Sequence, residues 1–128
     1  MDKKYFIAIY TNEVKDYCDG QFFSRVAQIT QERNSQVVII DNSLKSSYIN
    51  KIYEMTSVGR MFHNFYPSRI EIPEQPKRTQ FLRNVTESVL KLRETFLAGD
   101  YEYFVIIESD VIPPVDLLKR FDRDVELL

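Results

Sequence analysis

Residues 103–110 read Tyr-Phe-Val-Ile-Ile-Glu-Ser-Asp, so that five apolar residues end abruptly in a polar group. Because the apolar run is continuous rather than alternating, it predicts a strand with both faces covered, as in a parallel sheet. Residues 5–10 (YFIAIY) and 37–40 (VVII) form two similar runs, and the second is followed by Asp41-Asn42-Ser43. We therefore expect several parallel strands whose carboxyl ends carry polar side chains.

Helical patterns separate these runs. Residues 22–30 place apolar side chains at helical spacing behind Gly20, and residues 46–55 form a second helical stretch. The longest predicted helix covers residues 77–97, because Pro76 suits a helix start and Gly99 suits a helix end. Its expected buried stripe consists of Phe81, Val85, Val89, Leu92 and Phe96, flanked by Leu82, Leu90 and Leu97.

The alternation of strands and helices predicts the fold class. We expect a three-layer, doubly wound α/β fold with a mainly parallel sheet and right-handed crossovers, which is a Rossmann-like arrangement. A short extended piece is expected at residues 69–72, before Pro73. Residues 56–68 give no clear pattern and are expected to form an irregular connection.

Composition limits the class of protein. A chain of 128 residues corresponds to a single domain, here residues 1–128, and 44% apolar residues suffice for a core. The net charge of -2 provides no general attraction to nucleic acid or anionic lipid. Cys18 and His63 are too few for a disulfide or a zinc cluster, and no run approaches the ~18 apolar residues of a membrane span. We expect a cytoplasmic protein without an integral membrane segment.

The carboxyl ends of the strands are the expected ligand site, because ligands of open parallel sheets bind there. Glu108 and Asp110 could present two carboxylates to one hard cation, Mg²⁺ or Mn²⁺, which would in turn bind the oxygens of a diphosphate. The alternative is that these acids are solvated or cap the helix expected after Pro113-Pro114. Acidic pairs are too common for the pattern alone to decide.

Basic residues provide a second candidate feature. Lys77 and Arg78 stand at the start of the longest helix, with Arg83 further along, and a helix N-terminus attracts anions such as a diphosphate. Taken singly, each of these residues is better explained as a solvated surface residue. The glycines, Gly20, Gly59 and Gly99, exclude a GxGxxG turn and a GxxxxGK[ST] loop.

The order of these features resembles a known family. Residues 99–114 (GDYEYFVIIESDVIPP), followed by Leu117-Leu118, are similar to the "gdyi-fLDaDv-p-p-LL" segment of GT-A glycosyltransferases of the family 2 type. Three more matches occur in the same order: a first strand ending near Thr11, residues 37–43 (VVIIDNS), similar to "vivvDngS", and Arg83-Asn84, similar to "a-R-N".

The resemblance implies a nucleotide-sugar donor site and a DXD-like motif. Thr11 would lie beside the nucleoside, the Asp41 carboxylate would accept a hydrogen bond from the base, usually uracil, and Arg78 or Arg83 would approach the base or diphosphate. The donor implied is a UDP-sugar, and the acceptor is unknown.

The two acids would have separate roles. Glu108 would face the ribose or donor, and Asp110 would coordinate manganese or magnesium. Glu108 departs from the family's aspartate by one methylene, which changes the reach of that carboxylate.

The family's acceptor-binding half has no counterpart among these motifs. The general base that the resemblance implies is therefore expected beyond Leu128, and no catalytic residue is identified. The leading hypothesis is metal-dependent glycosyl transfer. The alternative is a non-catalytic, nucleotide-binding or oligomerising module of GT-A type, which could form a homo-oligomer. A phosphoacceptor receiver domain fits less well, because Thr11-Asn12-Glu13 stands where an acidic pair is needed.

Overall fold

The computed structural model describes residues 4–12, 18–31, 34–43, 45–57, 61–65 and 76–126. These residues form an α/β fold, as the alternating sequence pattern predicts. Its elements are β1 (Tyr5–Thr11), α1 (Asp19–Thr30), β2 (Ser35–Asp41), α2 (Ser46–Ser57), β3 (Met61–Phe65), α3 (Lys77–Ala98), β4 (Tyr103–Glu108) and α4 (Leu117–Glu126).

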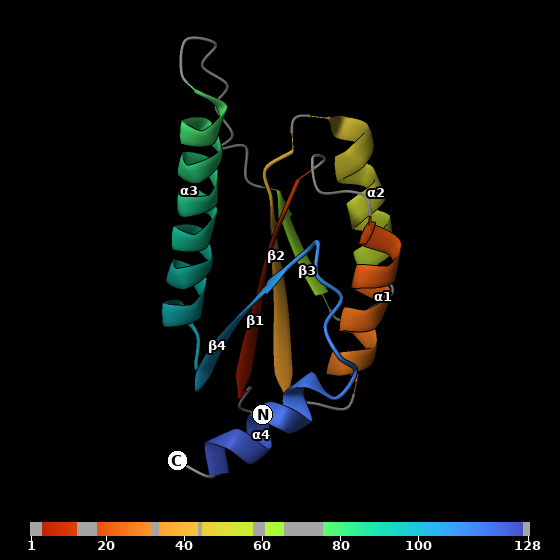
Figure 1. Ribbon diagram of the computed structural model, residues 1–128, viewed down its shortest axis with the longest axis vertical. Coiled ribbons are helices and arrows are strands. Elements are labelled where there is room, and N and C mark those ends of the chain that lie inside the picture. Colours follow the sequence, from red (N-terminus) through yellow and green to blue (C-terminus); the bar gives the residue numbers. More distant parts are fainter. Residues whose placement is uncertain are drawn as a thin grey trace.

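The strands form one parallel sheet in the order β3-β2-β1-β4 (Figure 1). The chain first proceeds from β1 through β2 to β3. It then returns along α3 to place β4 on the other side of β1. The winding direction therefore reverses between β1 and β4, and such a reversal defines the topological switch point of an open α/β sheet.

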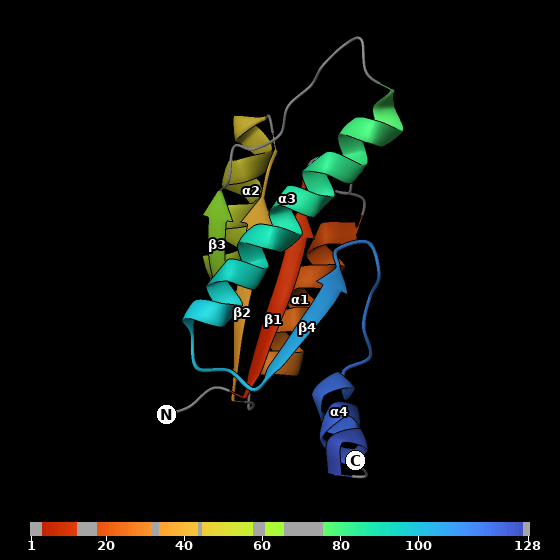
Figure 2. The ribbon, with the colours of Figure 1, turned by 90° about the vertical axis from the view of Figure 1, so that its left-hand side faces the viewer.

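Helices cover both faces of the sheet and create three layers. α1 and α2 lie on one face and α3 crosses the other, as the two perpendicular views show (Figures 1 and 2). Because side chains alternate along a strand, β1 contributes to two cores. Tyr5, Ile7 and Ile9 pack with α1, α2 and α4, whereas Phe6 and Ala8 pack with α3.

β3 corrects the sequence-based expectation of an irregular connection. Residues 61–65 pair in parallel with β2, and α2 continues to Ser57. The strand sequence contains His63 and Asn64, so it shows neither a continuous apolar run nor a strict alternation. Its conformation depends on pairing with β2, which a local pattern does not reveal. The extended piece expected at residues 69–72 lies outside the described residues.

β4 also differs from expectation, because its faces are not both covered. Among the described residues it pairs only with β1, and Ile106 is 50% exposed. α3 packs mainly on β1 and β2 and meets β4 through Phe96 against Phe104. The apolar run therefore predicts the strand correctly but not its burial.

The buried stripe of α3 is rotated from the predicted one. Asn84, Ser88 and Leu92 are the buried side chains of this helix. Phe96 packs edge-on against Phe6 and Phe104, at ring-centroid distances of 5.7 and 5.2 Å. This contact fixes the rotation of the helix, so that positions at i−4 intervals from Phe96 face the sheet. Phe81, Leu82, Leu90 and Leu97 are exposed.

Candidate functional site

Three strand ends lie side by side at the carboxyl edge of the sheet. Thr11 is in register with Asp41, and the Asn42 N–H donates to the Thr11 carbonyl at 3.3 Å. On the other side of β1, Tyr10 is in register with Glu108. The polar residues that close β1, β2 and β4 are therefore neighbours at the switch point, as expected for a ligand site.

The Thr11 side chain points toward α2. Its hydroxyl lies 3.0 Å from the Tyr48 hydroxyl, and both residues are buried. Burial raises the pKa of Tyr48, and the hydrogen bond with Thr11 opposes that rise in part. The negative charges of Asp19 and Asp41 raise it further. Tyr48 is thus a neutral phenol beside two carboxylates, and no sequence pattern singles it out as a site residue.

The Asp41 carboxylate closes the turn between β2 and α2. Its Oδ1 accepts hydrogen bonds from the Ser43 N–H, at 3.0 Å, and from the Ser43 hydroxyl. Asp41 has no exposed surface. Its geometry is that of an Asx-type turn, which explains the Asp-Asn-Ser sequence structurally. A base-binding role for Asp41 stays a prediction.

The start of α1 is joined to the end of β4. The Cys18 thiol donates to the Ser109 carbonyl at 3.2 Å, and this contact spans the switch point. Burial raises the pKa of Cys18, and the charges of Asp19 and Asp110 add to the rise. Two carboxylates from different elements therefore create a negative potential beside this thiol.

At the ends of β2 and β4, two buried polar groups have no hydrogen-bond partner within the described part of the chain. They are the side-chain amide of Asn42 and the hydroxyl of Ser109. Both residues are fully buried. A buried polar group without a partner costs about 1–3 kcal/mol, so such groups commonly face a ligand or an ordered water. Sequence reasoning missed them as site residues, although each directly follows a predicted strand.

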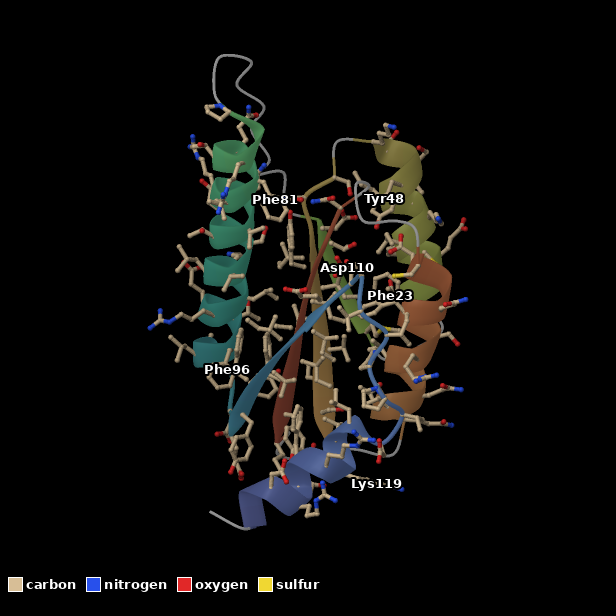
Figure 3. All side chains as sticks on the ribbon, viewed as in Figure 1. Phe23, Tyr48, Phe81, Phe96, Asp110 and Lys119 are labelled. Carbon is tan, nitrogen blue, oxygen red and sulfur yellow. The ribbon has the colours of Figure 1, made fainter. Side chains whose placement is uncertain are left out.

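Glu108 and Asp110 have different surroundings at the end of β4. Alternation from Ile107, which packs in the α1 core, places Glu108 on the face toward α3, where it is exposed. Asp110 lies past the strand and is partly buried (Figure 3). No cluster of three or more His, Cys, Asp or Glu side chains suited to a metal ion occurs among the residues that the structure describes.

The two arginines stand in the other layer. Arg78 and Arg83 are exposed on the first turns of α3, and Arg83 Nε donates to Glu87 at 3.3 Å. The start of α3 lies at the same end of the molecule as the strand tips, where Phe81 and Tyr48 flank the sheet (Figure 3). The fold thus brings the arginines to the end of the molecule where the strand tips lie, but across the sheet from Thr11 and Asp41.

Comparison with known proteins gives no match. The chain matches no family model, no curated protein and no solved structure. No described helix combines the length and the apolar character needed to cross a bilayer. Function must therefore be inferred from the residues at the strand ends.

Proposed function

We propose that this chain binds a nucleotide-diphosphate sugar at the switch point and forms the donor site for glycosyl transfer, as a GT-A protein of the family 2 type would. The supporting observation is the adjacency of three strand ends: β2 ending at Asp41, β1 at Thr11 and β4 at Glu108. The resemblance in sequence requires these segments to share one pocket. The strand order β2-β1-β4 is the arrangement that permits it.

The accessible acids would lie beside the diphosphate of the donor. Asp110 is partly exposed beside Cys18, in a region where the charge of Asp19 adds to its own. A site that is locally negative suits a divalent cation, and Mn²⁺ or Mg²⁺ needs only one or two protein carboxylates when phosphate oxygens and water complete its coordination. Asp110 would hold the cation, and Glu108 would face the donor from the open side of β4. The cation would neutralise charge on the diphosphate leaving group.

The buried polar groups at the strand ends would contact the nucleoside. At the ends of β2 and β4, the Asn42 amide and the Ser109 hydroxyl have no hydrogen-bond partner among the described residues. Thr11 already bonds to Tyr48, and Asp41 already bonds to Ser43. These two residues would therefore hold the strand ends in place beneath the nucleoside. An amide can both donate to and accept from a pyrimidine, which suits recognition of uracil.

Arg78 or Arg83 would approach the diphosphate from the α3 side. Both are exposed, and their guanidinium groups are always charged. The residues assigned here bind and orient the donor, and the base that activates the acceptor hydroxyl is assigned to no residue. Donor binding is therefore the property to test first.

Thermal unfolding with uridine diphosphate and Mn²⁺ tests the proposal. At ten times the dissociation constant, binding adds about 1.4 kcal/mol to the unfolding free energy, which raises the melting temperature by several degrees. Asp110→Ala is expected to abolish the shift, and so is removal of the metal by a chelator.

Asp100→Ala provides the matched control, because Asp100 is an exposed aspartate before the opposite end of β4. This variant should keep the full shift. If neither uridine diphosphate nor any nucleotide sugar raises the melting temperature, the chain is not a donor-binding protein. A metal-dependent shift that survives Asp110→Ala would show that another residue binds the cation.

A further inference from the structure

The outer edge of β4 is open along its length. Among the described residues β4 pairs only with β1, so the backbone groups on its other side meet no strand of the sheet. Half of the Ile106 surface is exposed. Strand edges in folded proteins are normally blunted by a lysine, a proline or a bulge, whereas Tyr103–Glu108 contains neither lysine nor proline.

A groove of about 460 Å³ runs beside this edge. Residues 103–106 of β4 form one wall, and Phe121 and Asp124 of α4 contribute to the other. Figure 2 shows the edge of β4 facing away from the other strands, with α4 near its start. The groove is therefore apolar, lies next to unpaired backbone and is bounded by a helix, as in domains that bind a peptide by adding it to a sheet.

Acidic side chains mark the groove at several points. Glu102 precedes the strand, Glu108 ends it, and both are exposed. Asp124 lines the wall formed by α4, where its carboxylate lies 3.7 Å from Arg123. The acids that carry the charge of this edge are therefore Glu102 and Glu108. Lys4, which precedes β1, pairs with Asp122 at 3.1 Å. The charge at the edge therefore favours an incoming strand with basic ends.

The same charges disfavour a second copy of this chain. An antiparallel β4–β4 pair centred on Val105 would place Glu102 of one copy opposite Glu108 of the other. Like charges directly opposite each other destabilise a strand pair. A slip of one residue in either direction leaves these acids as near neighbours.

We propose that the β4 edge and its groove bind an extended protein segment that has an apolar centre and lysine or arginine at both ends. The segment adds to the sheet beside β4 by backbone hydrogen bonds. Its apolar side chains cover Ile106 on one face and enter the groove on the other, and its basic ends meet Glu102 and Glu108. The site extends along β4 from Glu102 to Glu108, which the proposed donor site also uses, and peptide binding does not require a nucleotide.

A labelled synthetic peptide provides the test. The probe has two lysines, four alternating valines and threonines and two further lysines, and its binding to the full chain is measured by fluorescence anisotropy. We expect saturable binding that weakens as salt is added, because exposed charge pairs are screened. Two control peptides, one with glutamates in place of the lysines and one N-methylated at alternate residues, should not bind.

Protein variants locate the site. Ile106→Lys places a charge on the edge and should weaken binding by about tenfold or more. Leu90→Lys is the matched control, because Leu90 is 51% exposed against 50% for Ile106 but lies on α3. Glu102→Lys should weaken binding of the lysine-ended peptide, because only Glu108 then remains to meet a basic end. Unchanged melting temperatures would show that all three variants fold.

Three results would overturn the proposal. The N-methylated peptide could bind as well as the probe, which would exclude backbone pairing. Ile106→Lys could bind with unchanged affinity, which would place the peptide elsewhere. Sedimentation could show a dimer of the chain that Ile106→Lys converts to monomers, which would make a second copy the occupant of this edge.

Discussion

Asp41 illustrates how a single residue can be needed for the fold at a position predicted for ligand binding. Its Oδ1 satisfies the buried N–H of Ser43 at the junction of β2 and α2. Asp41→Ala leaves that N–H without its partner, so we expect the unfolding free energy to fall by about 1–3 kcal/mol in urea titrations. Asp41→Asn keeps an oxygen at the same place and should retain most of the stability. Equal stability of the alanine variant and the wild type would contradict this role.

Tyr5 gives a pH dependence with a defined sign. Its hydroxyl donates to Asp122, which also accepts from Lys4. Burial, followed by the hydrogen bond with Asp122, raises the pKa of Tyr5 from 10.0 to about 12. The folded state therefore favours the neutral phenol. This contribution to stability is complete below the pKa of the unfolded chain and is lost as the pH rises through 10 toward 12.

We expect the unfolding free energy of the wild type to decline more steeply in that alkaline window than that of Tyr5→Phe. Some slope should remain in the variant, because the pKa values of Lys4 and Tyr48 are raised as well. Urea titrations at a series of alkaline pH values measure the two slopes. Parallel curves for wild type and variant would show that the Tyr5 hydroxyl does not titrate differently in the two states.

At the scale of elements, the residue that follows α3, Gly99, must be small for reasons of space. The φ angle of Gly99 is -97°, so the left-handed conformation typical of glycine caps is absent at this residue. A Cβ at Gly99 would overlap the ring of Tyr101. That ring stacks on Phe96, at 6.1 Å between centroids, and meets Phe6 edge-on at 5.0 Å. Tyr101 therefore cannot move away without disturbing the core under α3.

Gly99→Ala is expected to lower the unfolding free energy by about 1–3 kcal/mol, the usual cost of overpacking. Gly20→Ala is the control, because no atom lies within 4 Å of the added Cβ in the first turn of α1. Alanine there should be neutral or stabilise by about 0.5–1 kcal/mol through helix propensity. Equal effects of the two substitutions in denaturant titrations would exclude the steric explanation.

At the scale of the whole molecule, the central strands and α3 differ in how much apolar surface they bury. β1 and β2 are almost completely buried, whereas α3 contributes one large fully buried side chain, Leu92. Leu92→Ala should cost about 2–5 kcal/mol. Leu90→Ala, two positions away and 51% exposed, should stay within about 0.5 kcal/mol of wild type.

Hydrogen exchange should show the same asymmetry. Amides of α3 are expected to exchange faster than those of β1 and β2, because local opening of this helix exposes little apolar surface. Leu92→Ala should accelerate exchange in α3 more than in the central strands. Uniform acceleration throughout the chain would indicate that the helix and the sheet open together.

The sequence by itself determined the elements with strong local signals. The apolar runs of β1, β2 and β4 and the helical periodicity of α1 and α3 predicted their positions correctly, and their alternation predicted a parallel α/β sheet. It also placed polar residues such as Thr11, Asp41 and Glu108 at strand ends. These features depend on neighbours within a few positions, which is why one sequence suffices to read them.

Only the tertiary structure decided what depends on distant partners. β3 exists through pairing with β2, the rotation of α3 is set by Phe96 against Phe6, and the exposure of Ile106 follows from the path of that helix. The meeting of Thr11 with Tyr48 and of Cys18 with Ser109 likewise joins residues far apart in the chain. Such contacts are selected by packing of the whole molecule, so no local pattern encodes them.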